Sequence, residues 1–174
     1  MASTAQVTST APPPAGRRAG LDLGVLVLSL LLVAAVAVSG ALINAGETDG
    51  WYAEADKPPA TPPGWLFGPV WSILYTSMAV AAWLVWRSSG FTGARTALGL
   101  YAVQLALNAA WTPVFFGAER LFVGLVIVLA LDLAILATAG AFRRHSRTAA
   151  LLLVPYLAWT LFATYLNAGV AALN

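Results

Sequence analysis

The sequence contains no cysteine, a single histidine and few charged residues. Without cysteine the chain can form no disulfide, no thiolate nucleophile and no sulfur-ligated metal site. The histidine, His145, lies between Arg144 and Ser146 in a basic stretch, where a solvated side chain is expected rather than a catalytic group or a metal ligand. We therefore expect no metal site and no obligatory cofactor.

Charged residues make up only 9% of the 174 residues, whereas 60% are apolar. A typical soluble domain has roughly 25% charged and roughly 45–50% apolar residues. The nine lysines and arginines lie at the ends of apolar runs and form no dense basic patch, so nucleic acid is not an expected partner. This composition indicates a protein whose partner is the lipid bilayer.

Five apolar segments approach the roughly 20 residues needed to cross a bilayer. They cover residues 21–44, 65–86, 94–116, 121–142 and 148–171. The sequence therefore predicts an all-α integral membrane protein, a five-transmembrane-helix bundle over residues 21–174, after a disordered cytoplasmic tail at residues 1–20. Arg17 and Arg18 precede the first segment, but its length exceeds that of a signal-peptide core, so we expect a retained helix.

The basic residues also predict an orientation. Seven of the nine fall on the side of the N-terminus, and Lys57 and Arg120 fall on the other. Positive residues concentrate on the cytoplasmic side of membrane proteins. We expect a cytoplasmic N-terminus, with the C-terminus and the first loop outside. That loop, residues 45–64, is the longest connection and is predicted to act as a lid.

Aromatic and polar side chains repeat at helical spacing on one face of three predicted spans. The three stripes are Trp71, Tyr75 and Met78; Gln104, Asn108, Trp111 and Phe115; and Tyr156, Trp159 or Thr160, Ala163 and Asn167. An unsatisfied polar group in hydrocarbon costs several kcal/mol, so the stripes should face inward. They predict a cavity for a flat, mostly apolar ligand in the outer half of the membrane, under the first loop.

Several of these residues allow two interpretations. Trp71, Trp111 and Trp159 lie too deep for the interfacial aromatic belt, and they serve either packing or ligand contact. Asp132 is an ionisable residue near the middle of a span, which suggests a functional group or a hydrogen-bonded tie between helices. The small residues Ala102, Ala106 and Ala110 recur every four positions and predict a homodimer through the third span.

Together these residues resemble the TspO/MBR family, that of the translocator and tryptophan-rich sensory proteins. The resemblance covers about 120 residues and rests on Trp51, Tyr52, Lys57, Pro58, Pro62, Pro63, Phe67, Pro69, Val70, Trp71, Leu74, Tyr75, Asn108, Trp111, Pro113, Phe115, Phe116, Asp132, Pro155, Tyr156, Trp159, Phe162, Ala163, Tyr165, Leu166 and Asn167. Each piece is a weak signal, but the ordered set is specific. It suits a bacterial-type member in a bacterial cell membrane.

The resemblance implies a five-helix bundle, often dimeric, that binds porphyrins such as protoporphyrin IX and haem. By position, the implied ligand-binding residues are Trp51, Tyr52, Trp71, Asn108, Trp111, Phe115, Asp132, Trp159, Ala163 and Leu166. Two departures modify this expectation. Ala60 stands where many members have an aromatic residue, which predicts a weaker hold by the lid, and no Lys or Arg follows Tyr165, which makes a sterol a less expected ligand.

Three classes of function agree with this resemblance. The first is a membrane receptor or carrier for tetrapyrroles, acting in tetrapyrrole or stress regulation. The second is a light-dependent porphyrin-degrading enzyme in which Trp71 and Trp159 are the catalytic residues, although the sequence shows no other catalytic constellation. The third is a membrane scaffold whose partner contacts depend on bound ligand.

Overall fold

The structure is a computed structural model that describes residues 15–47 and 50–174, and these residues form helices and no strand. The elements are α1 (Ala15–Glu47), α2 (Trp51–Glu54), η1 (Gly64–Leu66), α3 (Phe67–Gly93), α4 (Arg95–Thr112), η2 (Pro113–Gly117), α5 (Leu121–Arg143), α6 (Arg147–Leu152) and α7 (Val154–Leu173). The predicted all-α membrane fold is confirmed. The helix α1 begins inside the segment predicted as a disordered tail, and residues 1–14 of that tail lie outside the described residues.

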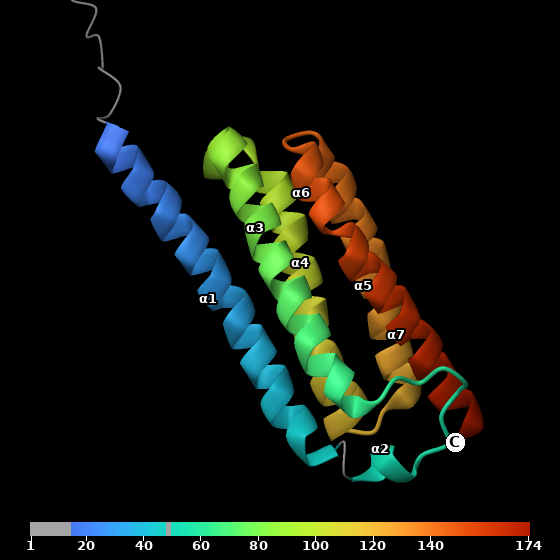
Figure 1. Cartoon of the computed structure of the whole chain (residues 1–174). Coiled ribbons are helices and arrows are strands. Elements are labelled where there is room, and N and C mark those ends of the chain that lie inside the picture. The colour runs from blue at the N-terminus through green and yellow to red at the C-terminus, as the bar shows by residue number, and fades with distance from the viewer. Residues whose placement is uncertain (1–14, 48–49) are drawn as a thin grey trace, which may run out of the picture.

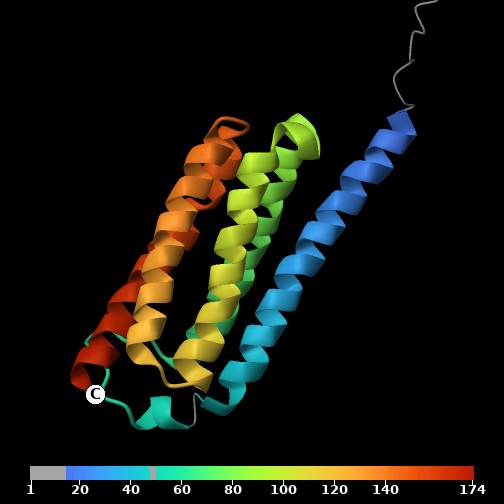
Figure 2. The same cartoon turned by 180° about the vertical axis from the view of Figure 1, so that it is seen from behind.

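Five helical segments are long and apolar enough to cross a membrane. They are Gly20–Ile43, Gly64–Gly93, Arg95–Gly117, Leu121–Arg143 and Arg147–Leu173. Figures 1 and 2 show them running up and down beside one another in a bundle, with the start of α1 and the C-terminus at opposite ends. The helix α1 packs on α3 and α4, α4 packs on α5, and α5 packs on α7. We call the end with α2 and the C-terminus the loop end.

Local backbone chemistry explains where the spans bend. Gly90 has φ 65° near the end of α3, a left-handed conformation that glycine adopts without a Cβ clash, and the chain turns there toward α4. The fifth span is divided between α6 and α7 at Leu153. Pro155 follows two residues later, and its ring has no N–H and would clash with the carbonyl four residues back in a continuous helix.

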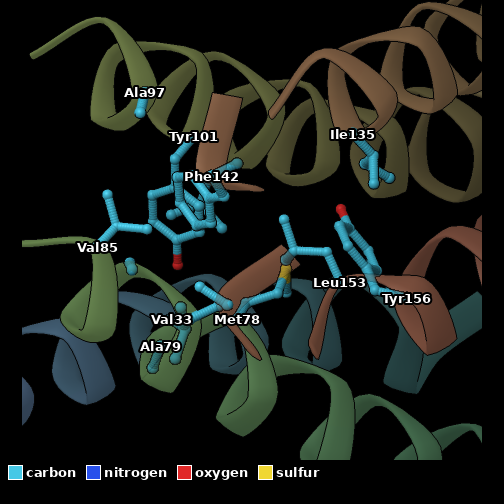
Figure 3. Packing of buried hydrophobic residues seen from close by; sticks show 14 of the residues in the cluster. Val33, Met78, Ala79, Val85, Ala97, Tyr101, Ile135, Phe142, Leu153 and Tyr156 are labelled. Carbon is cyan, nitrogen blue, oxygen red and sulfur yellow. The ribbon is translucent and has the colours of Figure 1, made fainter. Parts of the chain in front are cut away.

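Two groups of buried apolar residues hold the bundle together. The central core consists of Val33, Leu74, Met78, Ala79, Ala81, Ala82, Val85, Ala94, Ala97, Tyr101, Leu105, Leu131, Ile135, Phe142, Ala149, Leu153 and Tyr156. Figure 3 shows part of this core, in which Tyr101 and Phe142 lie side by side. Their rings stack with 5.9 Å between the centroids. The loop-end cluster is smaller and consists of Tyr52, Phe115, Phe116 and Val170.

The helix α1 packs against the bundle along only one narrow stripe. Val33 is its one fully buried residue among those whose side chains are described, and many of its leucines and valines face outward, as lipid contact requires. Two contacts tie it to α3 far from the loop end. The indole N–H of Trp83 donates to the Asp22 carbonyl at 3.0 Å, and Arg87 pairs with the Asp22 carboxylate at 3.5 Å.

The loop between α1 and α3 crosses the loop end and is held down along its length. The Trp51 indole N–H donates to the Phe116 carbonyl at 2.9 Å, and the Tyr165 hydroxyl donates to the Pro59 carbonyl at 2.9 Å. The side chain of Asn174 bonds both backbone groups of Asp56, at 3.0 and 3.1 Å. Figure 1 shows the loop passing from α2 beside the C-terminus and back to α3.

Candidate ligand-binding cavity

A cavity of about 460 Å³ lies between the central core and the loop-end cluster, beneath the loop. This volume falls within the roughly 300–1,000 Å³ of small-molecule sites. The loop, α1, α3, α4, η2 and α7 all contribute to its wall. The lining residues are Ala37, Val38, Gly40, Ala41, Tyr52, Ala53, Lys57, Thr61, Pro62, Gly64, Phe67, Gly68, Trp71, Ser72, Tyr75, Asn108, Trp111, Thr112, Phe116, Trp159 and Ala163.

Aromatic rings form two sides of the cavity. On the side of the central core, Trp71 stacks on Tyr75 at 5.3 Å between ring centroids. On the side of the loop-end cluster, Trp111 stacks on Phe115 at 5.0 Å, with an angle of only 12° between the rings. Since Phe115 is buried and does not line the cavity, it covers one face of Trp111 from behind. The arrangement leaves flat aromatic surface for a ligand.

A chain of hydrogen bonds joins α3, α4 and α7 next to the cavity. The Tyr75 hydroxyl donates to the Asn108 side-chain oxygen at 2.7 Å, and the Asn108 amide donates to the Tyr156 hydroxyl at 3.1 Å. Tyr156 donates in turn to the Gln104 side-chain oxygen at 2.9 Å. Buried polar groups need such partners, because an unpaired one costs about 1–3 kcal/mol. Asn108 keeps one amide N–H for a ligand, since the amide has two.

A second set of hydrogen bonds fixes Trp111. Its indole N–H donates to the side-chain oxygen of Asn167 at 3.1 Å, and the Asn167 amide donates to the carbonyl of Leu121 at 2.9 Å. These bonds connect α4, α7 and the start of α5. Because its only N–H is engaged, Trp111 can offer a ligand its ring and no hydrogen bond.

Trp71 and Trp159 differ from Trp111 in this respect. Both are half-buried and line the cavity, and neither indole N–H has a hydrogen-bond partner among the described residues. Phe67 packs edge-on against Trp159 at 5.8 Å between centroids. Each of the two tryptophans can therefore present both a ring and a free N–H donor to a ligand.

Tyr52 and Lys57 close the cavity from the loop. Tyr52 is 9% exposed and packs on Phe115 and Phe116. Its burial raises the pKa of the Tyr52 hydroxyl above the usual value of 10.0, so this phenol stays neutral at physiological pH. The Lys57 ammonium lies 5.0 Å from the centre of the Tyr52 ring and brings a positive charge to the wall.

The TspO/MBR family model matches residues 28–173, a range that includes every residue lining the cavity. The chain belongs to the TspO/MBR family. It is 40% identical over 149 residues to the tryptophan-rich protein TspO of Archaeoglobus fulgidus, covering 86% of this chain and 96% of that one. It is 49% identical over 124 residues to the translocator protein of Homo sapiens, covering 70% and 73%. It is 39% identical over 154 residues to the tryptophan-rich sensory protein of Cereibacter sphaeroides, covering 88% and 94%.

The family resemblance predicted ten ligand-binding residues, and in this TspO/MBR chain six of them meet at the cavity. These are Tyr52, Trp71, Asn108, Trp111, Trp159 and Ala163. Two others support the wall without lining it. Phe115 lies behind Trp111, and Trp51 packs on both Tyr52 and Phe115 while its N–H binds the Phe116 carbonyl.

Asp132 and Leu166 are not among the lining residues. Asp132 lies on α5, is 5% exposed, and accepts a hydrogen bond from the Thr164 hydroxyl of α7 at 2.8 Å. Its other carboxyl oxygen has no partner among the described residues. This geometry matches the interpretation of Asp132 as a tie between two helices.

The structure adds lining residues that the sequence did not single out. The largest group comes from α1, whose residues Ala37, Val38, Gly40 and Ala41 form one side of the cavity. Their small size was visible in the sequence, but nothing in an apolar run distinguishes a cavity wall from lipid contact. Lys57 and Phe67 belonged to the family match without a ligand role, and both line the cavity.

Proposed function

We propose that this TspO/MBR protein is a membrane receptor or carrier that binds tetrapyrroles, such as protoporphyrin IX and haem, in the cavity beneath the loop. The observation that carries the proposal is the pair of aromatic walls formed by Trp71 with Tyr75 and by Trp111, which Phe115 supports from behind. Aromatic rings attract one another in stacked or edge-on arrangements at about 4.5–7 Å, so two such walls favour a flat conjugated ligand.

The names of the relatives support the coarser part of this proposal. The human and sheep relatives are named translocator protein, and the Cereibacter sphaeroides relative is named a sensory protein. The chain covers more than two thirds of each of these proteins. A role in recognising a ligand within the membrane agrees with both names.

The first test is a titration of protoporphyrin IX into the purified protein, followed by the absorbance of the porphyrin. In the double variant Trp71→Leu and Trp159→Leu we expect at least tenfold weaker binding, because each stacked ring contributes about 0.5–1.5 kcal/mol beyond its buried area. Trp65→Leu is the matched control, since Trp65 is 72% exposed and lies outside the cavity wall. Equal affinities of the double variant and the control would place the site elsewhere.

Carriage requires a separate experiment, since binding alone does not move a ligand across a membrane. Uptake of protoporphyrin IX into liposomes containing the protein is expected to exceed uptake into empty liposomes if the protein is a carrier. If the protein still binds the porphyrin but uptake equals that of empty liposomes, carriage is refuted and only the receptor role remains.

A second candidate function is light-dependent degradation of the bound porphyrin. It is favoured by the position of Trp71 and Trp159, which share the cavity wall and have no hydrogen-bond partner for their N–H groups among the described residues. We expect the porphyrin absorption band to decay under light in aerated samples. The decay should be absent in the dark and in the variant Trp71→Phe with Trp159→Phe; decay at the same rate in that variant would refute a role for these two residues.

We further propose that the N-terminus is cytoplasmic and that the loop end faces outward. Arg87, Arg95, Arg143 and Arg147 lie at helix ends opposite the loop end, whereas Lys57 and Arg120 lie at it. The positive-inside rule supports this orientation. The test introduces a cysteine into the loop and treats intact cells with a membrane-impermeant thiol reagent. Labelling of intact cells is expected, and labelling only after lysis would indicate the opposite orientation.

We also propose a homodimer through α4. Ala102, Ala106 and Ala110 are exposed in the single chain, and small residues at this spacing allow close approach of two helices. Ala102 and Ala106 also line a groove between α4 and α1, so a second copy would enter the membrane-facing side of that groove.

A further inference from the structure

We infer that Lys57 makes the cavity selective for ligands that carry a carboxylate, and that in a tetrapyrrole it pairs with a propionate side chain. The inference deepens the proposed tetrapyrrole binding and rests on it. It also assigns a specificity role to a residue of the loop rather than to the aromatic walls.

The first observation is the distribution of charge around the cavity. Of the described residues that line it, Lys57 alone is charged. The other lining side chains are hydroxyls, one amide, aromatic rings and alkyl groups, and none of them carries a charge. Tyr52, whose pKa is raised by burial, supplies no negative charge beside the ammonium. A charged group on a ligand would therefore find a single complementary group.

The second observation is how the ammonium is held. It donates to the carbonyls of Ala53 at 2.9 Å and Ala55 at 3.0 Å and lies over the Tyr52 ring. A lysine ammonium has three N–H donors, so one remains for a ligand. These contacts fix the position of the flexible Lys57 side chain before a ligand binds. Less side-chain conformational entropy is therefore lost on binding.

The third observation is that these partners orient the charge without neutralising it. Among the described residues, the ion pair in the structure joins Arg87 to Asp22 near the opposite end of the bundle, and no carboxylate lies within 4 Å of Lys57. Among the described side chains, a ligand carboxylate would therefore be the first ionic partner of the Lys57 ammonium. A charge-assisted hydrogen bond is also about twice as strong as a neutral one.

The position of Lys57 in the loop also sets the orientation of the ligand. The aromatic walls come from α3, α4 and α7, whereas Lys57 reaches the cavity from the segment after α2. A ligand that pairs with Lys57 must place its carboxylate at the loop and its apolar edge toward the central core. A porphyrin with its propionates on one edge fits this division.

The test compares protoporphyrin IX with its dimethyl ester, which keeps the macrocycle and removes both negative charges. Wild-type protein is expected to bind the diacid about tenfold more tightly than the diester, or about 1.4 kcal/mol. This moderate factor reflects solvent screening of a pair that is only half-buried. In Lys57→Met the preference should disappear, and in Lys57→Arg it should remain.

Arg120→Met is the matched control, because Arg120 is an exposed cation at the same end of the bundle that does not line the cavity. It should keep the wild-type ratio of diacid to diester affinity. Each porphyrin partitions into detergent to the same extent with every variant, so comparing this ratio between variants cancels the partitioning. The same ratio of diacid to diester affinity in wild type and in folded Lys57→Met would overturn the inference while leaving tetrapyrrole binding intact. Failure of both porphyrins to bind the wild type would overturn the proposed function itself.

Discussion

Replacing Gly169 with alanine is expected to lift the loop from α7. A Cβ at this position would lie 2.5 and 2.6 Å from ring carbons of Pro58. Carbon atoms in contact are normally about 3.5–4.0 Å apart, so the loop or the helix must move by about 1 Å. The proline ring is rigid and Gly169 lies inside α7, so no flexible side chain can absorb the shift.

The expected cost follows from three contributions. Overpacking of this kind costs about 1–3 kcal/mol, and loss of the Tyr165 hydrogen bond to the Pro59 carbonyl adds about 0.5–1.5 kcal/mol. Alanine has a higher helix propensity than glycine, and this difference stabilises the variant by about 1 kcal/mol. Gly169→Ala should therefore lower the free energy of unfolding by about 2 kcal/mol.

Gly140→Ala is the matched control. Gly140 lies in α5, and a Cβ there would meet no atom within 4 Å, so only the gain in helix propensity applies. Thermal unfolding of the two variants in the same detergent measures the difference, and limited proteolysis of residues 45–64 reports on the loop. If Gly169→Ala unfolds at the same temperature as Gly140→Ala and its loop is cleaved no faster, the close contact between loop and helix is not what holds the loop in place.

Three further experiments address the interior, the ligand and the assembly. Asn108→Leu leaves the hydroxyl of Tyr75 without its acceptor and should destabilise the protein by about 1–2 kcal/mol in thermal unfolding; a loss below about 0.5 kcal/mol would show that the network adds little. Haem and metal-free protoporphyrin IX should bind within about threefold of each other, because no His or Cys lines the cavity, and a large preference for haem in parallel titrations would indicate an iron ligand. A cysteine at Ala106 should form a disulfide-linked dimer on mild oxidation, whereas a cysteine at the exposed Leu129 of α5 should not, and equal crosslinking of both would contradict an interface on α4.

The spans and the family could be predicted because they depend on features that a sequence displays directly. Apolar length identifies a crossing whatever its neighbours are, and the ordered aromatic and proline residues identified the family. The inward direction of the stripes with Asn108 and Trp111 also followed from the cost of leaving an amide in lipid, and both residues line the cavity.

Other features depend on relations between distant segments and were not predictable in the same way. The wall formed by Ala37 and Gly40 arises because α1 packs on α3, α4 and η2. The sequence of α1 has no polar residue at these positions to mark an inward face. The close contact of Gly169 with Pro58 likewise depends on the path of the loop. The division of the fifth span at Leu153 was signalled locally by Pro155, but a proline in a membrane span can also sit within a continuous helix.

The hydrogen-bond network next to the cavity has a consequence for biosynthesis. Gln104 and Asn108 belong to α4, but their shared partner Tyr156 belongs to α7, which is synthesised after α4 and α5. Until α7 is in the membrane, these amides lack that partner in one of the less apolar spans of the chain. A nascent chain arrested after α5 should therefore hold α4 less firmly in the bilayer than a chain that includes α7. The insertion of α7 thus completes the insertion of a helix synthesised before it.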